Sequence, residues 1–81
     1  MTVNRKNLSK IEIYEVEITV KVCYYDNDTG CAMQDSIKLQ PRETLSYISL
    51  TKDNDGLVFQ AENGNFYVLH DNDLANLKLL Q

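Results

Sequence analysis

Hydrophobic and polar residues alternate along residues 11–25, IEIYEVEITVKVCYY. Alternation combined with many β-branched residues is typical of a half-buried β-strand, because successive side chains of a strand point to opposite faces. The apolar face of this strand is predicted to carry every second residue from Tyr14 to Tyr24. Ile11 and Ile13 are out of phase with that set, so we expect a bulge or bend near Tyr14.

Three short segments of turn-forming residues divide the following part of the chain: NDTG at 27–30, DNDG at 53–56 and NG at 63–64. Asn and Asp bond their own backbone in turns, and Gly adopts positive φ without steric cost. Each segment is therefore predicted to close a β-hairpin, with positive φ at Gly30, Gly56 and Gly64.

The loop at 27–30 sets the expected register of the first hairpin. A four-residue loop places Asp26 opposite Cys31. Apolar residues then face apolar residues along the two strands, apart from Val22, which faces Asp35. The agreement between register and hydrophobic pattern supports both.

The other two turns set the registers of the second and third hairpins. A four-residue loop at 53–56 places Leu50 opposite Phe59, and a two-residue turn at 63–64 places Phe59 opposite Val68. In these registers Tyr67 falls on the face away from the core. The expected buried residues are Ile18, Val20, Val22, Ile37, Leu39, Phe59 and Val68.

The remaining segments complete a mainly β fold. Pro41 ends the second strand, because proline offers no ladder donor. Residues 71–81 begin with capping residues and space their leucines as a helix does, although Leu77 and Leu79 also alternate as in a strand; we favour a short helical turn. The sum is a five-stranded antiparallel meander that is predicted to curl into a small SH3-like or Sm-like barrel, with a short C-terminal helical turn.

The length and composition indicate a small globular protein. A chain of 81 residues suffices for one domain, and 43% hydrophobic and 25% charged residues are normal for such a domain. Residues 1–10 are expected to be a flexible basic tail, and residues 11–81 a single β-barrel domain. The sequence shows neither a membrane-spanning apolar run nor a leader pattern, so a cytoplasmic location is expected.

Charge is unevenly distributed along the chain. The net charge is −4, but Arg5, Lys6 and Lys10 make the first ten residues basic. The rest contains 12 acidic residues against five basic ones, a net charge of −7. An acidic body repels phosphate backbones, so direct binding of DNA or RNA is not expected, whereas a protein with a basic surface is a suitable partner.

The candidate chemistry argues against catalysis and against a bound metal or cofactor. Cys23 and Cys31 are predicted on opposite faces of the first hairpin, so free thiols are expected. Counted as an EF-hand from Asp26, the twelfth position is Ile37, which cannot ligate calcium. The single histidine, His70, is predicted opposite a leucine near the core, and all three glycines belong to turns. We therefore expect no catalytic, metal or cofactor-binding residues.

The leading interpretation is a small acidic, non-catalytic binding module that acts through a protein partner. An apolar patch outside the predicted core is either covered by the terminal helix or forms a contact surface, and acid-rich turns would rim it. The candidate partner-binding residues are Val58, Tyr67, Leu69, Asp26, Asp28, Asp53 and Asp55.

Two other functions remain open. One is a compact acidic inhibitor of the phage or mobile-element type, whose carboxylates would occupy a nucleic-acid-binding protein in place of phosphates. Carboxylates clustered on one face would favour this alternative, and carboxylates scattered around the turns would favour the module. The other is a structural subunit that self-associates through residues 74–80.

Overall fold

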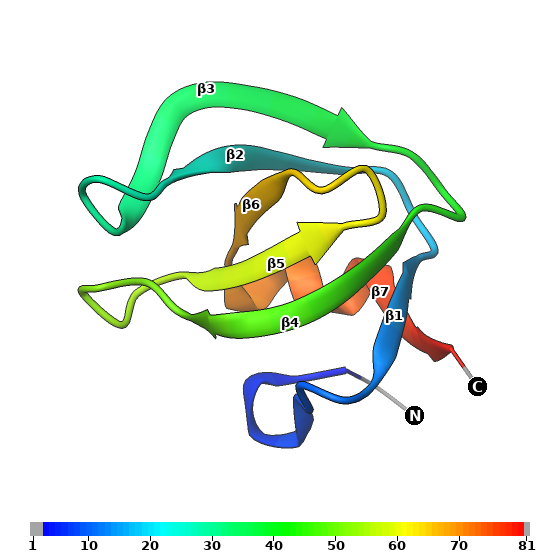
Figure 1. The fold of residues 1–81 in the computed structure, drawn as a ribbon. Coiled ribbons are helices and arrows are strands. Elements are labelled where there is room, and N and C mark those ends of the chain that lie inside the picture. The colour runs from blue at the N-terminus through cyan, green and yellow to red at the C-terminus, as the bar shows by residue number, and fades with distance from the viewer. Residues whose placement is uncertain (1–2, 81) are drawn as a thin grey trace.

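The computed structural model describes residues 3–80, which form one antiparallel sheet of seven strands and two short 3₁₀-helices (Figure 1). The strands are β1 (Ile13–Val16), β2 (Val20–Asp26), β3 (Cys31–Leu39), β4 (Thr44–Leu50), β5 (Leu57–Ala61), β6 (Phe66–Leu69) and β7 (Leu77–Leu80). The helices are η1 (Arg5–Asn7) and η2 (Asp71–Asn76). The strand order is β3-β2-β6-β5-β4-β1-β7. The prediction of a mainly β, antiparallel fold is confirmed.

The expected count of five strands in a simple meander is wrong. The run 11–25 is broken between β1 and β2, and the C-terminal segment contributes a strand of its own. Strand β1 pairs with β4 and β7, while β2 pairs with β3 and β6, so neighbours in the sheet are often distant in sequence. Strands β3 and β7 end the order, which leaves the sheet curled but not closed.

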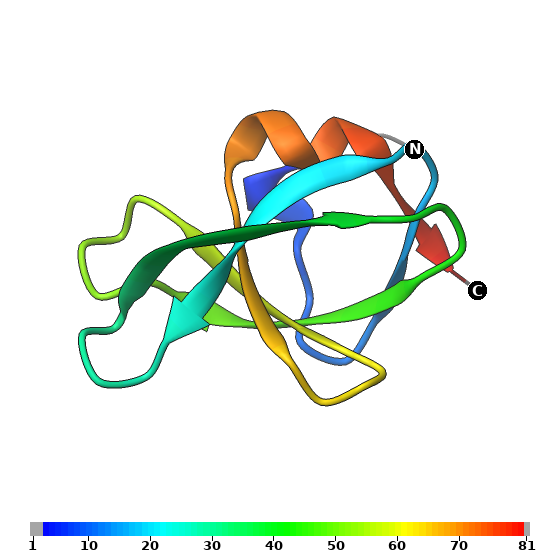
Figure 2. The ribbon, with the colours of Figure 1, turned by 90° about the horizontal axis from the view of Figure 1, so that it is seen from above.

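The break between β1 and β2 is held by η2. The backbone N–H groups of Glu17 and Ile18 both donate to the carbonyl of Asn76, at 2.8 and 3.2 Å, and the Asn76 amide donates to Thr19 O. Figure 2 shows η2 beside the start of β2. Ile18 lies at this bend with 58% of its surface exposed, so its predicted burial is wrong.

The first hairpin has the predicted loop, but only part of the predicted register. Asp26 pairs with Cys31 as predicted, but beyond a bulge the register shifts by two residues, and Val22 pairs with Ile37. The shift removes the unfavourable match of Val22 with Asp35. Because strand faces alternate with a period of two, a shift of two leaves the residues that pair beyond the bulge on their expected faces.

The second hairpin has a longer loop than predicted. Leu50 pairs with Leu57 rather than Phe59, so residues 51–56 form the connection. Thr51 is buried, and its hydroxyl accepts from the backbone N–H of Gly56 at 2.9 Å. The sequence pattern missed this because the hydroxyl of a buried threonine, and not only the DNDG segment, organises the loop.

The third hairpin slips by one residue. Its loop has three residues, because Ala61 N–H donates to Asn65 O at 2.9 Å, and Phe59 pairs with Tyr67 instead of Val68. A one-residue slip exchanges the two faces of a strand. Tyr67 and Leu69 therefore belong to the central core cluster.

The segment before β1 packs on the sheet instead of extending from it. Val3 belongs to the core cluster and Leu8 packs against it, although residues 1–10 were expected to be a flexible tail. The Arg5 side chain donates to Asp71 Oδ1 at 2.9 Å and to the carbonyl of Asn54 at 3.3 Å. Residues 1 and 2 lie outside the described part of the chain.

The C-terminal segment combines both alternatives that its leucines allowed. It forms the short helical turn η2 and then strand β7, which pairs with β1. Leu74 of η2 and Leu77 of β7 are both buried in the core cluster. Within residues 3–80, the helices are too short to cross a membrane.

Candidate partner-binding pocket

The predicted apolar patch does not lie at the surface. Val58, Tyr67 and Leu69 have exposures of 1%, 1% and 0%. Tyr67 packs against the ring of Tyr24, with centroids 5.3 Å apart. The slip of the third hairpin turns Tyr67 and Leu69 to the core face, so their predicted place outside the core is wrong. Val58 stays on the opposite face of β5 from Phe59, but it pairs with Val68 and is buried there.

The predicted acidic residues occupy two loops that lie side by side. Asp26 ends β2 and Asp28 lies in the β2–β3 turn that follows, while Asp53 and Asp55 belong to the β4–β5 loop. The backbone N–H of Lys52 donates to Gly30 O at 2.8 Å and joins the two loops. Both loops project at the same end of the molecule (Figure 1).

Several of these carboxylates also have local structural roles. Asp26 Oδ1 accepts from the backbone of Asp28 at 2.9 Å, and Asp53 Oδ1 accepts from the Thr51 hydroxyl at 2.6 Å. The Thr51 hydroxyl, followed by the backbone N–H of Asp55, lowers the pKa of Asp53 below its ordinary value. The acids therefore lie at turns, and contact between the loops brings the turns together.

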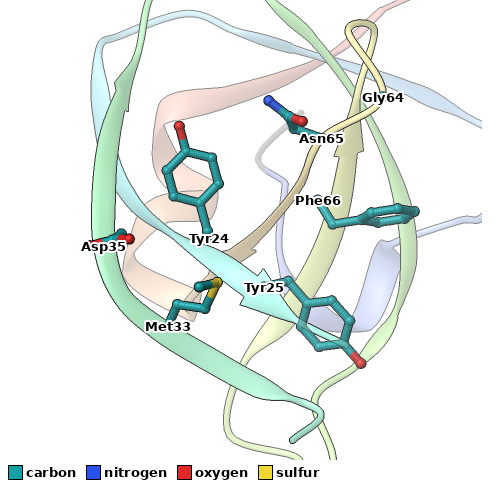
Figure 3. A pocket seen from close by; sticks show the side chains of 7 residues that line it. All are labelled: Tyr24, Tyr25, Met33, Asp35, Gly64, Asn65 and Phe66. Carbon is teal, nitrogen blue, oxygen red and sulfur yellow. The ribbon is translucent and has the colours of Figure 1, made fainter. Parts of the chain in front are cut away.

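A pocket of about 410 Å³ lies where the β2–β3 hairpin and the β5–β6 turn diverge. Its lining comprises Tyr24 and Tyr25 of β2, Met33 and Asp35 of β3, and Gly64, Asn65 and Phe66 at the start of β6 (Figure 3). The two tyrosines are adjacent in sequence, and their rings point to different sides of the strand (Figure 3).

The tyrosine rings of the pocket pack against other aromatic rings of the protein. Tyr24 contacts the buried Tyr67, and Tyr25 contacts Phe66 with centroids 6.5 Å apart. Tyr24, Tyr25 and Phe66 are half-buried, and Met33 is 40% exposed. Apolar surface is therefore held in place while still open to solvent.

Two departures from the regular hairpin pattern produce this pocket. In β2 only Tyr24 lies between the pairs Cys23–Ser36 and Tyr25–Ala32, whereas three residues of β3, 33–35, lie between them. Bulges of this kind re-aim side chains. The slip in the third hairpin brings Phe66 beside Tyr25. The mismatch of Val22 with Asp35 was the one sequence signal of the bulge.

The segments that form the pocket are acidic. Residues 24–35 and 62–66 together contain four acidic residues and no lysine or arginine. Asp35 lies in the lining itself. Lys52 of the neighbouring β4–β5 loop lies outside this lining, and its side chain occupies the space that a Cβ at Gly30 would enter.

The groups considered for catalysis or metal binding are dispersed. Among residues 3–80, no cluster of three or more His, Cys, Asp or Glu side chains is arranged to hold a metal ion. Cys23 and Cys31 are free thiols, and both are half-buried. His70 is exposed at the start of η2, 3.8 Å from Asp55, rather than opposite Leu57 as predicted, because Leu57 pairs with Leu69.

Comparisons of the chain with protein-family models, curated proteins and solved structures find no match.

Proposed function

We propose that this protein is a small acidic binding module that acts without catalysis, by docking a protein partner in the pocket between the β2–β3 hairpin and the β5–β6 turn. The observation that carries the proposal is the group of three aromatic side chains and a methionine that line this open pocket. Aromatic residues and methionine are enriched in the buried centres of protein interfaces.

The proposal includes the architecture and the location of the module. We assign the curled sheet to the SH3-like or Sm-like class of small barrels. The assignment is supported by β4, which pairs with both β5 and β1, and by Asn76, which ties η2 to the bend before β2. A cytoplasmic location and a partner with a basic surface complete the proposal; the net charge of −7 beyond residue 10 supports the latter.

Capture of partners by the immobilised protein tests the proposal. Tyr25→Ala removes a half-buried ring from the pocket, and Ile13→Ala is the matched control, since Ile13 is a 41% exposed apolar side chain on β1. A protein captured by the wild type and by Ile13→Ala is expected to be lost with Tyr25→Ala. With that protein purified, Tyr25→Ala should weaken binding about tenfold or more, as expected for an aromatic anchor.

Circular dichroism of both variants shows whether the fold is retained. A folded Tyr25→Ala chain that binds its partner as the wild type does would contradict the proposal. Dependence on Ile13 instead would move the interface to the β1 side of the sheet.

A second candidate is a compact acidic inhibitor of a nucleic-acid-binding protein. The contact between Lys52 and Gly30 favours it, because this contact places Asp26, Asp28 and two further aspartates at one end of the molecule. For an inhibitor, paired Asp28→Asn and Asp55→Asn changes should weaken binding more than Tyr25→Ala does, and added DNA or RNA should compete. A pocket-dependent module should be insensitive to the nucleic acid.

A further inference from the structure

We infer that the pocket recognises an arginine side chain of the protein partner. The inference rests on the proposed function and names the chemistry that the pocket selects. The juxtaposition of Asp35 with Tyr24, Tyr25 and Phe66 around one opening carries it.

The charge around the pocket is complementary to a cation. Within residues 3–80, no hydrogen bond or ion pair engages the Asp35 carboxylate, which is exposed beside the pocket. The pocket-forming segments 24–35 and 62–66 contribute four acidic residues and no basic ones. A cation entering the pocket therefore finds an available counter-charge and little repulsion from the lining.

The lining of the pocket combines aromatic rings with a carboxylate. In Figure 3 the side chains of Asp35, Met33 and Tyr24 lie at one side, and the rings of Tyr25 and Phe66 at the other. A cation over an aromatic face is attracted by the ring quadrupole, and a planar guanidinium stacks on rings while it binds a carboxylate in a bidentate manner. Lysine lacks this planar fork, so arginine is the better match.

The pocket lining also offers hydrogen-bond acceptors. The Asn65 side chain donates through Nδ2 to Tyr67 Oη at 3.4 Å, which leaves its amide oxygen as an acceptor in the lining. Together with Asp35, this oxygen suits a donor-rich guanidinium. The same charges disfavour a second copy of this chain, whose residues 11–81 carry −7, and disfavour nucleic-acid phosphates.

Short peptides of the form acetyl-Ala-Pro-Xaa-Pro-Ala-amide test the inference by NMR titration, since flanking prolines hold a chain extended. Xaa is arginine, its uncharged isostere citrulline, lysine or leucine. The arginine peptide should bind about tenfold more tightly than the citrulline peptide and about threefold more tightly than the lysine peptide. Its shifts should map to Tyr25, residues 33–35 and Phe66.

Asp35→Asn and Glu17→Gln separate a specific carboxylate from general charge. Glu17 is an exposed acid at the bend before β2 that lies outside the pocket lining and is not a candidate partner-binding residue. Asp35→Asn should reduce the preference for arginine over citrulline to about twofold, whereas Glu17→Gln should keep most of it. An arginine preference that is absent in the wild type, or unchanged in folded Asp35→Asn, would overturn the inference.

The outcomes distinguish failure of this inference from failure of the proposed function. If all four peptides bind equally and Tyr25→Ala abolishes their binding, the pocket docks apolar segments, and only the arginine inference is overturned. The same holds if no peptide shifts the pocket residues while a captured partner still depends on Tyr25. If the arginine peptide binds through Asp35 but no partner depends on Tyr25, the site is supported and the proposed docking function is not.

Discussion

Two loops of similar composition lie side by side at one end of this molecule: NDTG at 27–30 and TKDNDG at 51–56. The first is a four-residue hairpin loop in which Gly30 has φ of 75°. In the second, Asn54 has φ of 63°, and Gly56 is not among the residues with positive φ. Similar sequences thus place their glycines for different physical reasons.

Position 56 requires glycine because neighbouring side chains occupy the space that a Cβ would need. A Cβ at this position would lie 2.5 Å from Val68 Cγ1 and 3.1 Å from Thr51 Cγ2, both of them buried side chains. A Cβ at Gly30 would meet Lys52 Cβ at 3.0 Å, and one at Gly64 would meet open space. The predicted positive φ is therefore confirmed for Gly30 and Gly64 and wrong for Gly56, where packing imposes glycine.

The largest effect expected from this comparison is that of Gly56→Ala. Inserting a methyl group between Thr51 and Val68 should lower the free energy of unfolding by about 3 kcal/mol, as overpacking of a rigid site does. Urea denaturation measures the change. Adding Val68→Ala to Gly56→Ala should give a favourable coupling of about 1–2 kcal/mol in a double-mutant cycle. A neutral Gly56→Ala would show that the loop is not packed on β6 in this way.

The next effect is that of Gly30→Ala, which should cost about 1–2 kcal/mol because an alanine Cβ is strained in the left-handed region. Gly64→Ala is the matched control: it has φ of 92° but no neighbour within 4 Å of an added Cβ. Urea denaturation of the two variants should show a larger loss for Gly30→Ala, by the extra contact with Lys52. Equal losses would mean that the Lys52 side chain moves aside at no cost, so that the positive φ alone sets the loss of stability.

The same comparison shows how far the sequence predicts this fold. Turn chemistry correctly located three hairpins, and alternation correctly placed Val20 and Val22 in the core. The register of β6 could not be predicted, because residues 66–69, FYVL, are apolar on both faces. Periodicity then gives no preference between two- and three-residue turns, and the choice of turn decides which side chains are buried.

The candidate pocket was harder to predict than the core. It depends on the β3 bulge at residues 33–35 and on the position of Phe66, both of which are departures from a regular ladder. Local propensity does not specify such departures, because they are set by packing between strands that are distant in sequence. The sequence predicted the two acidic loops, but it did not predict that the backbone of Lys52 would join them.

A smaller effect is expected at Asn54, where the β4–β5 loop adopts the left-handed conformation without glycine. Asn tolerates this region better than other residues with a Cβ, so Asn54→Ala should cost up to about 1 kcal/mol. Asn54→Gly should be close to neutral, because freedom gained in the unfolded chain offsets the relief of strain. Urea denaturation again measures both. A stabilising Asn54→Ala would mean that this residue does not hold the left-handed turn.

The smallest effect is expected at Asp53. Its carboxylate accepts a hydrogen bond from a side-chain hydroxyl, whereas the carboxylate of Asp26 next to the other loop accepts one from a backbone N–H only. The Thr51 hydroxyl, followed by the Asp55 backbone N–H, lowers the pKa of Asp53 below its ordinary value of 3.8. The unfolded chain therefore binds a proton at this carboxyl at higher pH than the folded chain does. The resulting stabilisation is complete above the ordinary pKa and is lost as the pH falls through the lowered one.

Urea midpoints measured across this acidic range should therefore fall less steeply for Asp53→Asn than for the wild type. NMR titration of the Asp53 carboxyl carbon provides the direct measurement, with Thr51→Ser as a control that keeps the hydroxyl. Thr51→Val removes the largest cause of the shift, so the pKa of Asp53 should rise toward its ordinary value. If this pKa stays low in a folded Thr51→Val chain, backbone donors alone organise the loop, and the two loops would then be held by the same kind of bond.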